Sequence, residues 1–144
     1  MQRPIDVFRV YMAQRYADLY SDDLHTQIGA VAFKDGDILG HGANVYVGDR
    51  PIPFDHLQRP LKYEYITHAE VDLSKDIDLR GATVYVTACP CVNCAAALVN
   101  AGVSRVVYGK SDDLALAARW AESWAKAEAL FAENDVDVQS VIVA

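Results

Sequence analysis

The chain has 144 residues, of which 52% are hydrophobic and 23% charged, a composition that suits one globular domain with a substantial apolar core. Its formal net charge of −7 argues against duplex DNA, long RNA and anionic membranes as partners, because like charges repel. No apolar run approaches the roughly 20 residues of a membrane span, and the opening "MQRPIDVFRV" lacks the continuous apolar segment of a secretory signal. We therefore expect a cytoplasmic protein with a single domain over residues 1–144.

The hydrophobic periodicity alternates between the helical and the extended pattern along the chain. In chain order it predicts a helix (5–20), two hairpin strands (28–33 and 37–43), an irregular segment (44–63), a short helix (66–74), a strand (81–88), a helix (89–102), a strand (103–109), a long helix (112–133) and a final strand (136–143). Gly36 would supply the positive φ of the hairpin turn. Pro90 suits the first turn of one helix and Gly102 lies just past its end.

This order of elements predicts the fold class. Strands that are joined by crossover helices pair in parallel, with right-handed connections. The long helix before the last strand is such a crossover, so the last two strands should be parallel. We expect an α/β fold, a three-layer α/β/α sandwich with a five-stranded mixed sheet.

The three cysteines lie within six residues, as Cys89, Cys91 and Cys94. An odd number so closely spaced is a poor disulfide framework but a plausible metal or thiol site. Cys91 and Cys94 are three residues apart at the predicted start of a helix, where both sulfurs can face one point and the helix terminus favours thiolate. Cysteines are also common as small buried hydrophobic residues, so this spacing alone leaves packing open.

His68 and Glu70 narrow the alternatives. One histidine and two cysteines supply three ligands to zinc, and a catalytic site keeps the fourth position for water. Zinc lowers the pKa of bound water to near 7, and a carboxylate within reach can take that proton and pass it to a leaving nitrogen. The zinc deaminases have this arrangement, H-x-E followed by P-C-x-x-C, with the Glu not a ligand. The sequence contains both motifs, as "HAE" at His68 and "PCVNC" at Pro90.

Beyond these motifs, the chain resembles the deoxycytidylate (dCMP) deaminases of the cytidine deaminase superfamily. The similar segments are "SDDLHTQIGAV", "RPLKYEYITHAE", "GATVYVTACPCVNCAAALVNAGVSRVVYG" and "ARWAESWAKAEALFAENDVDV". The resemblance implies a cytidine deaminase-like fold and zinc-dependent hydrolysis of dCMP to dUMP and ammonia. It also implies a homo-oligomer, a hexamer or a dimer, and control by dCTP and dTTP.

Carried over to this chain, the resemblance implies that His68, Cys91 and Cys94 bind one zinc ion and that Glu70 moves protons. Residues implied to contact the substrate are Asn44, Ala69, Thr87, Ala88 and Cys89. The chain departs from the family pattern H-A-E-x-N-A at Asp72 and Leu73, and from G-Y-N-G at Ala43 and Val45.

A nucleotide also needs a cation for its phosphate, and the candidates in the predicted loops are Arg50, Arg59, Lys62 and His25. Trp120 and Trp124, one helical turn apart, are interpreted as core or subunit-interface residues and not as a stacking surface for a base. The alternative functions are a deaminase of another cytosine or guanine nucleoside, free base or modified deoxycytidylate, a tRNA or single-stranded DNA deaminase, and a non-catalytic zinc module. A C-x-x-C redox protein would leave His68 and Glu70 unexplained.

Overall fold

The computed structural model describes residues 2–23, 26–48, 52–53, 65–111 and 114–143. The chain begins with helix α1 (Pro4–Tyr20) and a hairpin of β1 (Gly29–Lys34) and β2 (Asp37–Ala43). Asp35 and Gly36 form the turn with φ of 53° and 85°, which confirms the predicted role of Gly36. Then come α3 (Ala69–Ser74), β5 (Thr83–Val86), α4 (Val92–Asn100), β6 (Arg105–Ser111), α5 (Leu114–Glu133) and β7 (Asp137–Val143). The predicted order of elements is confirmed.

A short two-stranded ladder differs from the prediction. Strand β3 (Val45–Tyr46) pairs antiparallel with β4 (Ile66–Thr67), whereas residues 44–63 were expected to be irregular throughout. Two residues are too few to show the period of 2 that reveals a strand in a sequence. The ladder places Asn44 and His68, which flank it in sequence, on the same side of the molecule.

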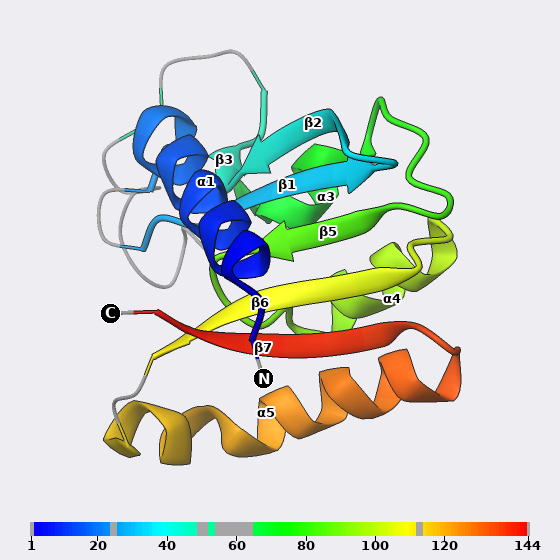
Figure 1. Ribbon diagram of the computed structural model, residues 1–144. Helices are drawn as coiled ribbons and strands as arrows, with labels where there is room; N and C mark the ends of the chain where they lie inside the picture. Colours follow the sequence, from blue (N-terminus) through cyan, green and yellow to red (C-terminus); the bar gives the residue numbers. More distant parts are fainter. Residues whose placement is uncertain (1, 24–25, 49–51, 54–64, 112–113, 144) are drawn as a thin grey trace.

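The main sheet has the strand order β2-β1-β5-β6-β7, which Figure 1 shows from the side of α1. Strand β1 is antiparallel to β2 and to β5, while β5, β6 and β7 run parallel. The prediction of a five-stranded mixed sheet with its last two strands parallel is therefore confirmed. The parallel half arises because α4 and α5 each return the chain to the edge at which the preceding strand began.

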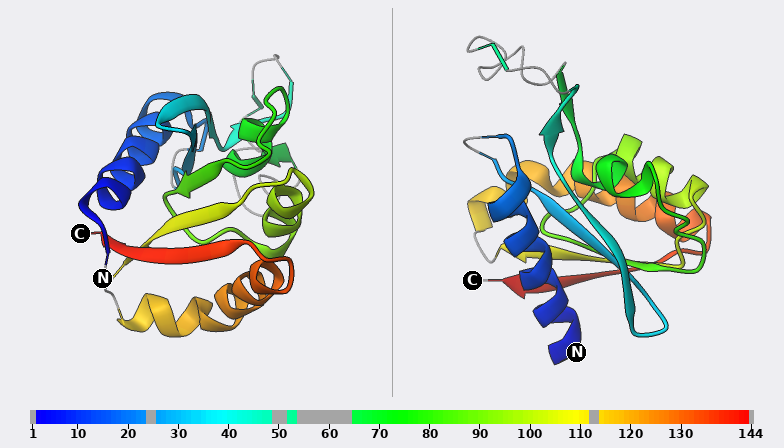
Figure 2. Two further views of the ribbon diagram at one scale, coloured as in Figure 1. Left: turned by 45° about the vertical axis from the view of Figure 1, so that its right-hand side comes forward. Right: turned by 90° about the horizontal axis from the view of Figure 1, so that it is seen from above.

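Helices cover both faces of the sheet, as the view from above in Figure 2 shows. Helix α1 packs on one face, where the buried cluster includes Val10, Val31, Tyr85 and Val107. Helices α3, α4 and α5 cover the other face over a larger cluster, with Leu73, Val84, Leu98, Tyr108 and Phe131 among its members. These are the three layers of the predicted sandwich. None of the helices among the described residues is both long and apolar enough to cross a bilayer.

Helix α4 ends as the sequence indicates but begins two residues after Pro90. Cys91 is its N-cap residue, so Pro90 precedes the helix instead of occupying its first turn. At the other end Gly102 has φ of 81°, and the Val103 amide donates to the Leu98 carbonyl while the Gly102 amide donates to that of Val99. This pair of hydrogen bonds is the Schellman arrangement that glycine favours.

Gly42 lets α3 lie directly against β2. A Cβ atom at this position would come within 2.4 Å of the Ala69 carbonyl oxygen and 2.5 Å of the Leu73 amide nitrogen. Any side chain larger than hydrogen would therefore push α3 away from the sheet. Since His68 and Glu70 lie at the start of this helix, the close contact also fixes their position.

Candidate active site

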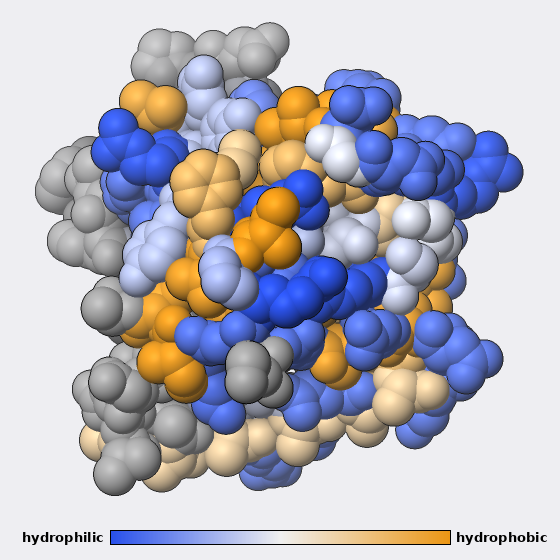
Figure 3. Space-filling model, in the orientation of Figure 1, coloured by the Kyte–Doolittle hydropathy of each residue, from blue (hydrophilic) through white to orange (hydrophobic). Residues whose placement is uncertain are grey.

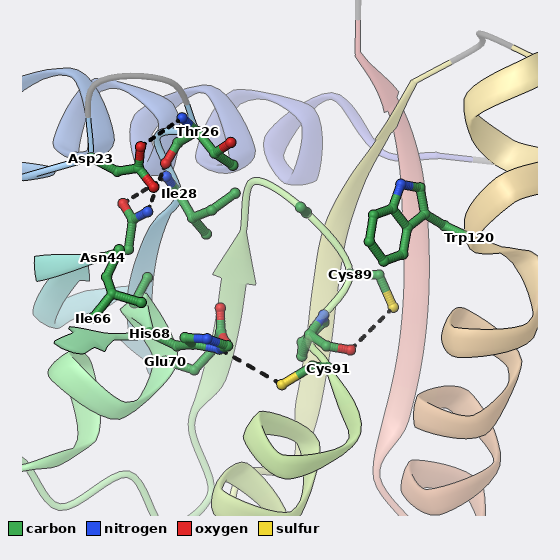
Figure 4. Close-up of a pocket in the computed structure, with 13 residues that line it drawn as sticks. Asp23, Thr26, Ile28, Asn44, Ile66, His68, Glu70, Cys89, Cys91 and Trp120 are labelled. Atoms are coloured by element: carbon green, nitrogen blue, oxygen red, sulfur yellow. Dashed lines mark hydrogen bonds between the residues drawn. The ribbon is translucent and has the colours of Figure 1, made fainter. Parts of the chain in front are cut away.

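The candidate site lies at the edge of the sheet where β5 ends and β1 begins. The loop after β5, the approach to β1, the start of α3 and the first turns of α5 meet there around a cavity of about 280 Å³ (Figure 4). The lining residues are Asp23, Thr26, Ile28, Asn44, Ile66, His68, Ala69, Glu70, Ala88, Cys89, Pro90, Cys91 and Trp120. In α/β sheets, ligands commonly bind at the carboxyl ends of parallel strands, and this cavity follows that rule.

His68, Cys91 and Cys94 come together as one group of possible metal ligands. The Nδ1 atom of His68 lies 3.1 Å from the Sγ of Cys94 and 3.7 Å from the Sγ of Cys91. All three ligand atoms lie within 4.8 Å of one another. Around a tetrahedral zinc ion, nitrogen and sulfur ligands lie about 3.6 Å apart. The donor set and its spacing therefore fit zinc, with three protein ligands and room for a fourth from outside.

The two helix starts explain why these residues meet. His68 is the N-cap residue of α3 and Cys91 is that of α4. The Cys91 sulfur also accepts a hydrogen bond of 3.4 Å from the Cys94 amide, as an N-cap side chain does for the third residue of its helix. Both motifs of the sequence are thus helix N-termini that face the same point.

The two thiols interact strongly with each other. A hydrogen bond from Cys94, followed by the contact with His68, lowers the pKa of Cys91 to about 4. The same hydrogen bond raises the pKa of Cys94, with burial adding to the effect. The contact with Cys91 also raises the pKa of His68. One thiolate is therefore present at neutral pH, and a bound cation would release the proton of the second thiol.

Glu70 lies in the same cavity and is only 3% exposed. Burial raises the pKa of its carboxyl group, while a hydrogen bond with the Cys94 side chain opposes the shift. A carboxyl group that is buried beside metal ligands has a pKa moved toward neutrality, as general acid–base chemistry requires. Figure 4 shows Glu70 beside His68 and across from Cys91.

Asn44 fixes the opposite wall of the cavity. Its Oδ1 accepts hydrogen bonds from the Ser21 hydroxyl and the Ile28 amide, and its Nδ2 donates to the Thr26 carbonyl at 2.7 Å. The side chain of Asp23, 4% exposed, accepts from the Thr26 amide. Asn44 therefore lines the cavity, as predicted, and also holds the segment that leads into β1.

The other predicted contact residues divide into three groups. Ala69, Ala88 and Cys89 line the cavity. Thr87 is not among the lining residues, because its Oγ1 accepts from the Gly29 amide and its own amide donates to the Gly29 carbonyl. The phosphate candidates lie outside the described residues: Arg50, Arg59, Lys62 and His25.

Trp120 was expected in the core or in a subunit interface. Its side chain is 45% exposed and lines the cavity near Cys89, so it is not a core residue, and the subunit interface stays a prediction. Trp124, one turn later, is half-buried beside Lys110, whose Nζ lies 5.5 Å from the centroid of its ring. The helical spacing showed that both tryptophans share a face of α5, but it could not show that this face extends past the sheet toward the cavity.

Several lining residues were not predicted: Asp23, Thr26, Ile28 and Ile66. Ile66 belongs to β4 and the other three lie between α1 and β1. Their segments resemble the family, but no motif assigned these four residues a role, and the fold brings them to the site. The departure at Asp72 also has a structural role, because its Oδ2 accepts a hydrogen bond of 3.1 Å from the Ala43 amide next to Asn44. Leu73, the second departure, is completely buried.

The three-layer fold and the His, Glu, Cys, Cys site define the class of this protein as a cytidine deaminase-like deaminase. Residues 6–124 match the family of MafB19-like deaminases. An uncharacterized deaminase of the luxG 3′ region in Aliivibrio fischeri is 32% identical over 132 residues, 90% of this chain and 89% of that protein. The chain therefore belongs to the MafB19-like deaminase family.

Two further similarities are to deoxycytidylate (dCMP) deaminases. Human deoxycytidylate deaminase is 31% identical over 98 residues, which are 61% of this chain but only 55% of the human protein. The structure of dCMP deaminase from the cyanophage S-TIM5, in complex with dCMP and dUMP, superimposes with a TM-score of 0.72. The superposition covers 98% of this chain and 99% of the phage protein at 21% identity, which shows a common fold.

Proposed function

We propose that this protein catalyses the hydrolytic deamination of dCMP to dUMP and ammonia, with one zinc ion in each subunit. The observation that carries the proposal is the buried Glu70 carboxyl group, which shares the cavity with His68 and Cys91 and forms a hydrogen bond with the third donor, Cys94. The relatives named deoxycytidylate deaminase, and the phage dCMP deaminase with the same fold, support dCMP as the first substrate to test.

His68, Cys91 and Cys94 would hold the zinc. When bound there, zinc lowers the pKa of a water molecule to near 7 and so supplies the nucleophile. Glu70 would take one proton from the water that attacks C4 of the cytosine ring and pass it to N3. It would then move the remaining hydroxyl proton to the amino nitrogen, so that the C4–N4 bond breaks, ammonia leaves and C4 keeps the oxygen as a carbonyl. The raised pKa of Glu70 suits this exchange, since the carboxyl group must both accept and donate a proton.

The remaining lining residues would position the nucleoside. Backbone groups of Ala69 and Ala88, with the side chain of Cys89, border the part of the cavity where the base must lie. The Asn44 amide group has two N–H donors, and the described residues occupy one of them through Thr26. We assign the second donor to a hydroxyl group of the sugar.

The phosphate group of dCMP requires a cation, and the lining of the cavity therefore supports a second candidate function. Among the described lining residues there are two carboxylates, Asp23 and Glu70, and no lysine or arginine. A cation for a phosphate would have to come from the predicted candidates Arg50, Arg59, Lys62 and His25, or from Arg119 next to Trp120. The acidic lining favours, as the alternative, a deaminase of an uncharged nucleoside or base.

The expected homo-oligomer remains a prediction, as do the dCTP and dTTP effectors. Several apolar side chains of α1 are exposed, including Ile5, Phe8 and Leu19. Figure 3, seen from the side of α1, shows apolar residues among the polar ones on this face. Burial of such side chains between subunits is favourable. Sedimentation velocity would distinguish a monomer from a dimer or a hexamer.

The proposed function is tested by turnover of dCMP, CMP, deoxycytidine, cytosine and guanine by the zinc-loaded protein. We expect dCMP to be preferred over deoxycytidine, and Glu70→Gln to lower kcat by at least about 100-fold. The Glu70→Gln variant should retain its zinc, which metal analysis would verify. Preference for deoxycytidine would support the alternative substrate, and full activity of Glu70→Gln would contradict the mechanism.

A further inference from the structure

One face of α5 carries a stripe of apolar residues whose exposure changes along the helix. Trp120, Trp124, Ala127 and Phe131 follow the spacing of one helical face. Ala127 and Phe131 are completely buried, Trp124 is half-buried and Trp120 is 45% exposed. The same face therefore packs in the core near the end of the helix and borders the candidate active site near its start.

We propose that Trp120 contributes to substrate binding by stacking its indole against the base in the cavity. Apart from the imidazole of His68, it is the one aromatic side chain among the described lining residues. Flat heterocycles bind well to such a surface, because every base has a π-face. The inference rests on the proposed function, since it assumes that the cavity takes a nucleobase.

The position of Trp120 relative to the catalytic groups agrees with this role. In Figure 4 the indole lies on the side of Cys89, while Ile28 and Asn44 line the other side and Glu70 lies below Ile28, beside His68. A ring that stacks on the indole and reaches Glu70 with its amino group would occupy the space between Trp120 and the segment of Ile28. Cys89 and Pro90, the lining residues that precede Cys91, are weakly polar or apolar, so this wall favours a ring over a charged group.

The indole has one contact outside the cavity. The guanidinium carbon of Arg119 lies 5.6 Å from the centroid of the Trp120 ring, within the range of a cation–π contact. This contact favours the observed orientation of the indole, and 45% of the side chain remains exposed and available to a ligand.

Kinetics provide the first test of the proposal. Loss of base stacking in Trp120→Ala should raise KM for dCMP about tenfold and leave kcat within about threefold. Trp120→Phe keeps an aromatic ring and should retain a KM within about threefold of the original. An unchanged KM in Trp120→Ala would overturn the inference.

Fluorescence gives a readout that does not depend on turnover. In the zinc-loaded Trp124→Phe variant, Trp120 is the sole tryptophan, since the chain has two. Addition of dUMP, the proposed product, should change its emission saturably. The matched variant is Trp120→Phe, in which only Trp124 emits, and dUMP should leave that emission unchanged.

Equilibrium dialysis with dUMP separates the two levels of the proposal. If dUMP binds and the emission of Trp120 does not respond, the stacking role is wrong while the proposed function stands. An equal response from Trp124 alone would also contradict the role of Trp120. If dUMP does not bind and dCMP is not deaminated, the proposed function fails and the inference fails with it.

Discussion

Asp6 shows how one buried residue joins α1 to the sheet. Its carboxylate is completely buried and accepts hydrogen bonds from the Tyr85 hydroxyl at 3.0 Å, from two nitrogens of Arg105 and from Arg3. Arg105 also donates to Gln139 at 2.7 Å, which extends the network to β7. The carboxylate therefore connects the start of α1 with three strands, β5, β6 and β7.

This network predicts a particular dependence of stability on pH. The hydrogen bond from Arg105 holds the pKa of Asp6 well below its usual range, although burial opposes the shift. A lowered pKa in the folded state means that the stabilisation is complete above the unfolded value of about 4 and is lost as the pH falls below it. The urea midpoint of the original protein should therefore fall between about pH 5 and pH 2 more steeply than that of Asp6→Asn.

At neutral pH the same substitution should lower the free energy of unfolding by about 3 kcal/mol, because the largely buried guanidinium of Arg105 then keeps only the exposed carboxylate of Asp137, 3.4 Å away, as an ionic partner. Asp78→Asn is the matched control. Asp78 and Arg80 form an ion pair of 2.8 Å in which both side chains are exposed. If the two substitutions lowered the free energy of unfolding equally, the burial of Asp6 would not strengthen its contribution to stability.

At the scale of single elements, the end of α5 contains a conformational strain that can be relieved. Asp135 has φ of 60°, and the amides of Asp135 and Val136 donate to the carbonyls of Ala132 and Phe131. This is the arrangement that Gly102 completes after α4, but here an aspartate occupies the left-handed position. Glycine adopts that conformation without the steric cost of a Cβ atom.

Asp135→Gly should therefore raise the free energy of unfolding by about 0.5 kcal/mol, measured from urea denaturation curves. Glu133→Gly is the control within the last turn of the same helix, where glycine should lower the stability by about 1 kcal/mol. Stabilisation by both substitutions, or by neither, would contradict the role assigned to the left-handed position.

The elements also show what the sequence could and could not predict. Helices α4 and α5 were predictable because their apolar residues repeat with the helical turn. The Cys91–Cys94 pair was predictable because its spacing lies within one helix start, and His68 was recognised through the H-x-E motif. The β3–β4 ladder, the lining residues Asp23 and Ile28, and the exposure of Trp120 depend on segments that are distant in sequence, which no local pattern records.

For the whole molecule, the metal-ligand group joins α3 to α4 at the margin of the core. Of the three ligands only Cys94 is buried, with 2% of its surface exposed, and the large buried clusters on the two faces of the sheet are formed by other side chains. We therefore expect the zinc-free protein to stay folded, unlike a small zinc finger.

Removal of the metal should nevertheless lower the thermal stability. Zinc at a free concentration of 100 times its Kd adds about 2.7 kcal/mol to the free energy of unfolding. A chelator should therefore lower Tm by roughly 8 °C, while the far-UV circular dichroism signal of the folded protein persists. The chelator should lower the Tm of Glu70→Gln by the same amount, because this variant keeps all three ligands. It should change the Tm of Cys94→Ala little, because that variant has lost a ligand. Unfolding of the whole chain by the chelator would disprove the independence of the core.

Cys91 has two tasks, because its sulfur belongs to the metal-ligand group and also accepts the amide hydrogen bond that starts α4. Serine is a good N-cap residue but a poor zinc ligand. Replacement of the sulfur by oxygen would therefore remove metal binding and keep the N-cap hydrogen bond. A protein of this fold can thus lose its metal through a single exchange of sulfur for oxygen and keep its helix. That exchange is a short route by which a gene duplicate could give up catalysis and survive as a binding protein.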